Sequence, residues 1–290
     1  MSLISVLISL AIESYWNKLD ALRQYDWFES YSNWMNEKFS QIVFMESTIG
    51  VILVIAPVCA AVWLLESMFG GVLWLFGFAF GIAVLLYCLG PRSLATDAQA
   101  YLDAAEAGDH DLAKQHAESI LGYETEEQEK KLADTVKKEL LVQANDRLIG
   151  ILFWFVLLGP VGAVLYRLSI LLKQQTTFEA GEFAEASRNL YWIMNWLPAR
   201  LCVVGYALAG NFIDTMSYWN SLSDFWLKDS EELLVTSGCG SLRQDLRADI
   251  QSNTEEFFIN GVAHAISLIK RAVVVFLAIL ALMTLTGWVL

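Results

Sequence analysis

Two arginines interrupt long apolar stretches of this sequence, and their residue type and setting suit them to chemistry. Arg167 follows an uncharged run from Leu148 to Tyr166, and Arg200 separates the uncharged stretches 189–199 and 201–213. A guanidinium binds a carboxylate or a phosphate through paired hydrogen bonds. The two arginines therefore predict a binding site for an anionic ligand in a cavity lined by protein.

Acidic residues at the edges of apolar runs offer these arginines partners within the chain. The candidates are Glu13, Glu46 and Asp214. In one interpretation, an acid such as Glu13 or Glu46 acts as a general base beside the arginines. In the other, the arginines are structural: Arg167 extends its charge to the membrane interface, and Arg200 pairs with one of the acids.

The composition identifies the chain as a membrane protein. Its 290 residues are 56% hydrophobic and 18% charged, and the mean hydropathy of +0.45 lies outside the ordinary soluble range. The net charge of -13 argues against nucleic-acid binding, which requires clustered basic residues. No CxxC pair occurs, and His110 and His116 do not share a helix face, so no metal site is predicted.

Four uncharged segments are long enough to cross a bilayer and predict an all-α integral membrane protein. They are residues 47–65, 67–91, 148–166 and 272–290, with a turn at "ESMFG" between the first two. Pro57 and the Gly159–Pro160 pair are expected to kink the first and third helices. Gly77 and Gly81 form a small-residue face that another helix can approach closely.

The segment 190–213 is predicted to be kinked and partly inserted. Neither uncharged half spans a bilayer alone, and an arginine in the middle of a span costs about 2.5–3.5 kcal/mol on insertion scales. A helix broken at Pro198 and buried against other spans removes that cost. The tryptophans and tyrosines of 173–270 predict further helices along the membrane surface, whereas the polar block 229–258 reads as an exposed loop with helical pieces.

Residues 93–146 are predicted to form a small helical domain on the cytoplasmic side. Its helix boundaries are marked by Gly108, Asp109, Gly122 and a Thr125–Gln128 capping box. In the helix that follows, one face carries three apolar residues, Leu132, Val136 and Leu140.

The predicted organisation has six segments. They are an N-terminal amphipathic helix region (1–41), a transmembrane hairpin (42–92), the helical domain (93–146), a third transmembrane helix (147–172), interfacial helices with the break at Pro198 (173–270) and a fourth transmembrane helix (271–290). Basic residues place the N-terminus and the helical domain in the cytoplasm. Four spans would then put 173–270 outside the cytoplasm. The basic residues that flank this region favour the cytoplasmic side instead; they are Arg167, Lys173, Lys270 and Arg271. A crossing or dip within 190–213 would remove this conflict.

Two central motifs resemble those of a known family. "GPVGAVLYRLS" (159–169) followed by "LYWIMNWLPARL" (190–201) is similar to the paired motifs of the CobD/CbiB family, membrane proteins of cobalamin synthesis that join an aminopropanol unit to a corrinoid carboxyl. "LISVLISLAIESYWNKL", "AYLDAAEAGDHDLAKQHAESILG" and the chain length look closer to its AmpE branch. The resemblance implies five pocket residues: Tyr166, Arg167, Asn195, Pro198 and Arg200.

The AmpE branch implies a regulatory or sensory protein of the bacterial inner membrane, linked to β-lactamase induction and muropeptide recycling. Such a protein would bind an anionic ligand and work with a muropeptide-recycling amidase or another cytoplasmic protein. The alternative is a membrane-bound amide-forming synthase acting on an activated carboxylate, although the synthase motifs "GDP…HP" and "TLDSMVGYK" are absent, with "NKLDALRQYDW" and "LSILLKQQTT" in those places. No GxxxxGK[ST] loop occurs, so no nucleotide site or other cofactor is predicted. The lipid bilayer is an expected partner, and a homodimer remains open.

Overall fold

The computed structural model describes residues 2–15, 25–39, 48–72, 74–89, 94–125, 129–175, 181–221, 229–242 and 255–286. Every regular element in these ranges is a helix, so the all-α class is confirmed. The chain divides into two compact units. The first comprises Met1–Pro91, Gly150–Leu197 and Met283–Leu290, and the second Arg92–Ile149 and Pro198–Leu282.

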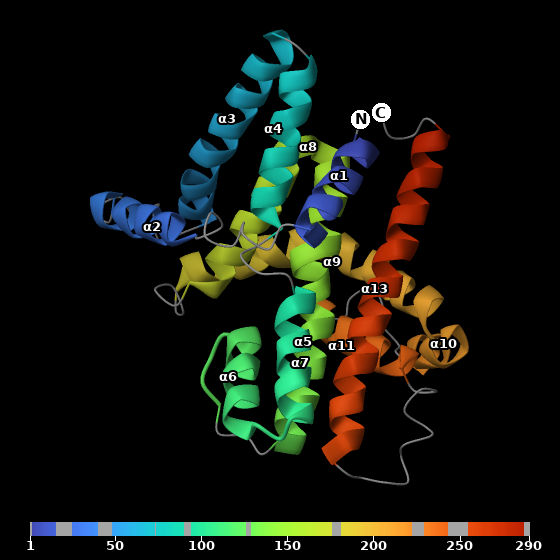
Figure 1. Cartoon of the computed structure of the whole chain (residues 1–290). Helices are drawn as coiled ribbons and strands as arrows, with labels where there is room; N and C mark the ends of the chain where they lie inside the picture. Colours follow the sequence, from blue (N-terminus) through green and yellow to red (C-terminus); the bar gives the residue numbers. More distant parts are fainter. Residues whose placement is uncertain are drawn as a thin grey trace. The chain divides into compact units, whose positions relative to one another are not determined.

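The first unit is built around a hairpin of two apolar helices. It contains α1 (Ser2–Tyr15), α2 (Asp26–Phe39), α3 (Thr48–Val72), α4 (Trp74–Cys88), α8 (Gly150–Gln174) and α9 (Glu182–Ala209) as far as Leu197. Figure 1 shows α3 and α4 side by side, and α8 contacts both. One apolar core joins α2, α3, α8 and α9 through buried side chains that include Phe28, Val54, Leu168 and Phe183.

Three helical stretches are long and apolar enough to cross a membrane: Thr48–Phe69, Lys131–Gln174 and Ile259–Leu285. Large apolar side chains remain exposed on them, such as Trp63 at 59% and Leu282 at 64%, which suits contact with lipid. α4 is equally apolar but only 15 residues long. The chain is thus a membrane protein, and the count of four spans stays a prediction.

The predicted turn at "ESMFG" is wrong, because α3 continues through these residues to Val72. The pentapeptide contains no proline, and its residues continue the helix. Within α3, the hydroxyl of Ser67 donates to the Trp63 carbonyl at 2.8 Å. α4 therefore begins only at Trp74, which makes it shorter than the predicted second span.

α8 reverses direction in its middle. Gly159 has φ 70° and ψ -157°, a conformation available essentially to glycine alone. A Cβ atom on Gly150 would collide with the Tyr166 ring, and one on Gly162 with the Trp154 carbonyl oxygen. In a straight helix, residues 150 and 166 would lie about 24 Å apart at about 1.5 Å per residue. The two halves of α8 therefore run back along each other.

This reversal agrees with the kink predicted at Gly159–Pro160, but it is larger than the kink expected within a third transmembrane helix over 147–172. Pro160 begins the second half, where its missing N–H costs nothing. A Cβ on Gly159 would lie 3.3 Å from the carboxylate oxygen Oε1 of Glu66. Glu66 of α3 thus sits beside a helix N-terminus, where a negative charge is favourable.

The small-residue face of α4 is covered at Gly81 by the same chain. A Cβ there would lie 3.6 Å from Cζ of Phe155 and 3.9 Å from Cγ of Pro160, both on α8. The helix that approaches this glycine is therefore α8.

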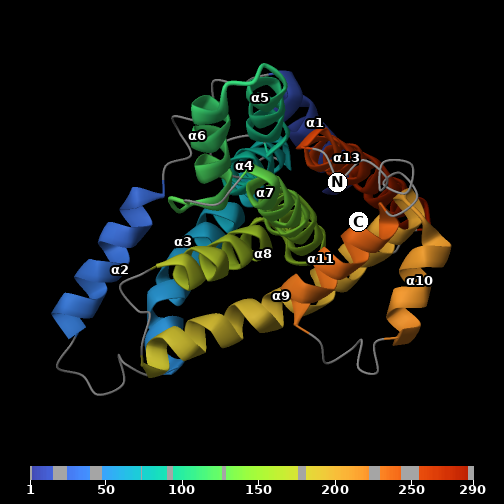
Figure 2. The same ribbon diagram turned by 90° about the horizontal axis from the view of Figure 1, so that it is seen from below.

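The second unit contains the helices of the predicted helical domain together with later elements. They are α5 (Leu94–Glu106), α6 (His110–Leu121), α7 (Glu129–Ala144), η2 (Asn145–Ile149), the end of α9, α10 (Phe212–Ser221), α11 (Ser230–Ser241) and most of α13 (Glu255–Leu285). Figure 2 shows α5 and α6 side by side, in agreement with their contacts. The buried residues Leu140, Tyr206, Leu233 and Val262 belong to its core.

The predicted helix boundaries of this unit are confirmed where the structure describes them. Gly108 and Gly122 both have positive φ, at 73° and 79°. The Asp109 carboxylate caps α6 by accepting from the Leu112 amide at 3.1 Å. Leu132, Val136 and Leu140 are all buried. Gln128 of the predicted capping box lies outside the described residues.

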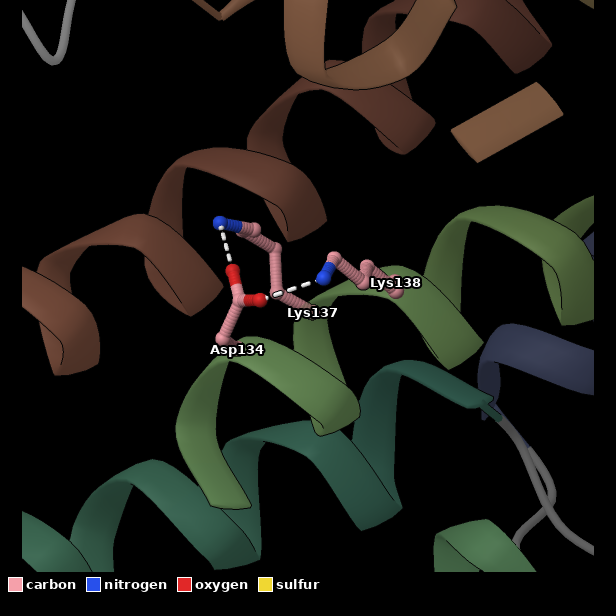
Figure 3. A network of polar contacts seen from close by, with 3 residues as sticks. All are labelled: Asp134, Lys137 and Lys138. Carbon is pink, nitrogen blue, oxygen red and sulfur yellow. Dashed lines mark hydrogen bonds and ion pairs between the residues drawn. The ribbon is translucent and has the colours of Figure 1, made fainter. Parts of the chain in front are cut away.

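The charged side of α7 carries local ion pairs (Figure 3). Asp134 pairs with Lys137 and with Lys138, each at 2.6 Å. Pairs three and four residues apart on a partly exposed helix surface stabilise it by a few tenths of a kcal/mol. These ion pairs stabilise α7 and are not evidence for a binding site.

The predicted break at Pro198 is also wrong, since α9 runs uninterrupted from Glu182 to Ala209. A proline removes one backbone hydrogen bond, and a helix can accommodate this by bending. In the polar block 229–258, predicted as an exposed loop with helical pieces, α11 confirms a helical piece, but this helix is partly buried. Asp229 caps α11 by accepting from two backbone amides, and Leu233 and Leu234 are fully buried.

Candidate functional site

A cavity of about 620 Å³ lies within the first unit, between the start of α2 and helices α3, α4 and α8. Its walls are apolar over most of their extent and include Pro57, Ala61, Leu65, Ala83, Val164 and Leu168. Arg167 is the charged residue among its described lining side chains. The cavity is therefore an apolar space with a positive charge in its wall.

Arg167 is nearly buried, with 8% of its surface exposed. Its guanidinium carbon lies 4.5 Å from the centre of the Tyr25 ring, a cation–π contact. Its Nε atom has no hydrogen-bond partner, and no carboxylate pairs with it, among the residues that the structure describes. A buried charge that lacks a counterion is strongly disfavoured. The arrangement therefore favours an anion at Arg167.

Aromatic residues surround the arginine and are tied to the end of α4. The Tyr25 hydroxyl donates to the Tyr87 carbonyl at 2.6 Å, and Nε1 of Trp27 donates to the Tyr87 hydroxyl at 2.6 Å. Burial raises the pKa of Tyr25 to about 12, although the positive charge of Arg167 opposes the rise. Tyr25 is therefore a neutral hydrogen-bond donor at physiological pH and supplies no counterion.

Tyr166 and Asn195, both predicted as pocket residues, are brought together by the structure without lining the cavity. The Tyr166 hydroxyl donates to Oδ1 of Asn195 at 3.0 Å, and Nδ2 of Asn195 donates to the Tyr191 hydroxyl at 2.8 Å. Tyr166 and Asn195 are fully buried, and Nζ of Lys173 lies 4.0 Å from the centre of the Tyr191 ring. This chain of hydrogen bonds fastens α8 to α9 next to Arg167.

Arg200 belongs to the second unit and has partners there. It is 4% exposed, and its Nη1 donates to the Ser230 hydroxyl at 3.0 Å. Burial lowers the pKa of Arg200, and the nearby Asp229 carboxylate opposes that change. Asp229 was not among the acids expected near the arginines.

The three acidic candidates have different settings. Asp214 accepts from the Asn211 side-chain amide at 3.3 Å, while its own backbone N–H donates to Oδ1 of Asn211 at 3.0 Å, so it belongs to the start of α10. Glu13 is half-buried near the end of α1. Glu46 lies outside the described residues. No carboxylate occurs among the described lining residues of the cavity.

The aromatic residues that line the cavity were not predicted from the sequence. Tyr25, Trp27, Tyr31 and Tyr87 come from two segments far apart in the sequence and meet at the cavity. The enrichment of tyrosine and tryptophan at membrane interfaces is a signal that could have grouped them near Arg167. Nothing in the local sequence around Asp229 and Ser230 indicates their contact with Arg200.

Comparison with known proteins shows which family the chain resembles. A family model described as CobD/Cbib protein matches residues 4–232. The cobalamin biosynthesis protein CobD of Chromobacterium violaceum is 30% identical over 196 residues, which cover 66% of this chain and 61% of that protein. The protein of the same name from Stutzerimonas stutzeri is 30% identical over 195 residues, which cover 66% of this chain and 62% of the relative.

The chain therefore covers less than two thirds of the length of each of these relatives. No solved structure matches. The family match extends from α1 into the start of α11 and includes both arginine motifs.

Proposed function

This chain belongs to the CobD/CbiB family, and from that premise we propose that it is an inner-membrane enzyme of cobalamin synthesis that forms an amide from an activated carboxyl group and an amine. The family match over residues 4–232 carries the proposal. The names of the two relatives support the same pathway.

The proposed reaction develops negative charge that Arg167 can stabilise. The amine nitrogen attacks the carbonyl carbon of an acyl phosphate, the bond from that carbon to the phosphate oxygen breaks, phosphate leaves and the nitrogen loses a proton. Negative charge is present on the substrate and grows on the leaving phosphate. A guanidinium held in an apolar wall stabilises such charge more strongly than one in water.

A second candidate is an AmpE-type regulatory protein that binds an anionic ligand without turnover. Two observations favour it: the synthase motifs are absent from the sequence, and no carboxylate occurs among the described lining residues of the cavity. In this case α5, α6 and α7 would report occupancy to a partner in muropeptide recycling and β-lactamase induction. The relatives' names favour the enzyme over this regulator.

Turnover by the purified full-length chain separates the two candidates. The protein in lipid nanodiscs is mixed with ATP, a corrinoid that has a free carboxylate, and 1-amino-2-propanol or its phosphate, and the amide is measured by mass spectrometry. We expect product, and about a hundredfold less of it per unit time from Arg167→Gln, the usual scale for loss of one transition-state donor. The matched control is Arg188→Gln, an exposed position on α9.

Two results would count against the enzyme. One is corrinoid or nucleotide binding with no amide under any of these conditions, which supports the regulator. The other is equal turnover by wild type and Arg167→Gln, which removes Arg167 from the reaction.

A further inference from the structure

The lining of the cavity extends along the helices that wall it. On α3 its lining residues Pro57, Ala61 and Leu65 recur every four positions on one face. At about 1.5 Å per residue, that face is about 12 Å long. Its α4 wall runs back from Cys88 to Ala83 and is also apolar, so the space resembles a slot parallel to the helix axes.

The slot borders a surface that suits lipid. Pro57, Ala61 and Ala83 are exposed as well as lining it. The neighbouring residues on α3 include Trp63 and Met68, which are 59% and 67% exposed. Apolar side chains at this exposure on a helix long enough to span a membrane indicate acyl chains as their surroundings.

One end of the slot has the composition of a membrane interface. Tyr25, Trp27, Tyr31 and Tyr87 line the cavity together with Arg167, and the Tyr25 ring contacts the guanidinium. Tyrosine and tryptophan concentrate at the depth of lipid headgroups, where a ring and a polar atom are both satisfied. This composition suits a position of Arg167 at the depth of lipid phosphates.

We propose that this cavity binds an anionic phospholipid of the surrounding bilayer, with its phosphate on Arg167 and one acyl chain in the slot between α3, α4 and α8. The phosphate supplies the counterion that Arg167 lacks among the described residues, and the apolar walls take the chain. A small soluble acid would satisfy the charge but leave the slot without an apolar partner. The lipid source is favoured for this reason.

This inference rests on the proposed function in one respect, because both concern an anion at Arg167. The lipid is the resident ligand, which an acid substrate or regulatory ligand has to displace. Occupancy by anionic lipid then regulates access to the arginine. An increase in the anionic fraction of the membrane should weaken the apparent binding of the acid.

The test measures lipid binding in the absence of any substrate. Trp27 lines the cavity, so it should be quenched by a phospholipid with brominated acyl chains. Because the chain has eleven tryptophans, the Trp27 signal is the difference between wild type and Trp27→Phe. We expect brominated phosphatidylglycerol to quench it at about tenfold lower mole fraction than brominated phosphatidylcholine, as a charge-assisted hydrogen bond implies.

Three variants test the two parts of the site separately: the arginine that binds the phosphate and the slot that binds the acyl chain. Arg167→Gln should abolish the preference for phosphatidylglycerol, whereas Arg167→Lys should retain part of it. Ala61→Phe fills the slot and should weaken quenching by both lipids. Arg188→Gln, which removes an exposed arginine from α9, should leave both curves unchanged.

Two outcomes would overturn the proposal. The first is an unchanged phosphatidylglycerol preference in Arg167→Gln. The second is displacement of the brominated lipid by millimolar inorganic phosphate or acetate, which would identify a soluble-anion site. The quenching measurement does not depend on amide formation, and the amide assay does not depend on lipid preference. Each proposal can therefore be contradicted without the other.

Discussion

At the scale of single residues, two arginines with similar sequence settings have different partners. Arg200 meets Ser230 and the charge of Asp229, whereas Arg167 meets the ring of Tyr25 and an apolar cavity. Both are buried, so burial does not distinguish them. Their neighbours do distinguish them, and for this reason the proposed anion site is at Arg167 and not at Arg200.

Asn195 should matter for stability more than its neighbours on α9. Asn195→Leu removes both the acceptor of the Tyr166 hydroxyl and the donor to Tyr191, in a position with no exposed surface. Loss of buried hydrogen bonds should cost about 2 kcal/mol. Thermal unfolding in detergent measures it, with the exposed Asn189→Leu as control. Equal melting temperatures for the two variants would show that the chain of hydrogen bonds does not hold α8 to α9.

At the scale of elements, the reversal of α8 decides where Arg167 lies. The kink was predictable from Gly159 and Pro160, because this pair cannot continue a regular helix. The full reversal was not, since the run from Leu148 to Tyr166 has the length and composition of a straight span. Close approach of the two halves depends on Gly150 and Gly162, which lie beside the partners Tyr166 and Trp154.

A reversal of α8 within the membrane would also remove the conflict between the basic residues around 173–270 and a four-span topology. If α8 enters and returns, its second half ends on the side of the first unit where Tyr25 lies at the start of α2. The contact of Arg167 with Tyr25 agrees with this. Arg167 and Lys173 then share the side favoured by the positive residues of the N-terminal region.

Sidedness of labelling tests this arrangement. Single cysteines replace the exposed residues Glu29 of α2 and Gln174 of α8 in a variant without the four native cysteines. A membrane-impermeant maleimide should label both from the same face of oriented vesicles, and the cysteine-free parent should not react. Labelling from opposite faces would mean that 150–174 crosses once, contrary to the reversal.

At the scale of the whole molecule, local signals were predictable and distant partners were not. The caps at Asp109 and Gly122 and the buried face of Leu132 are encoded within one or two helical turns, and the structure has them. The neighbours of Arg167 come from α2 and α4, many residues away. The same holds for Asp229 beside Arg200, so both environments depend on tertiary packing.

The family match runs through segments of both compact units, and the function proposed here concerns the full chain. The central physical claim concerns the first unit alone: Arg167 is a buried cation beside an apolar space, it has no carboxylate partner among the described residues, and we propose that an anion from outside the chain pairs with it.

The most direct test is an experimental structure of the full chain in nanodiscs that contain phosphatidylglycerol. We predict density for a phosphate within hydrogen-bond distance of the Arg167 guanidinium, continuous with density for an acyl chain along α3. A guanidinium paired with a carboxylate of the protein itself, such as that of Glu46, above a cavity that holds no anion, would contradict it.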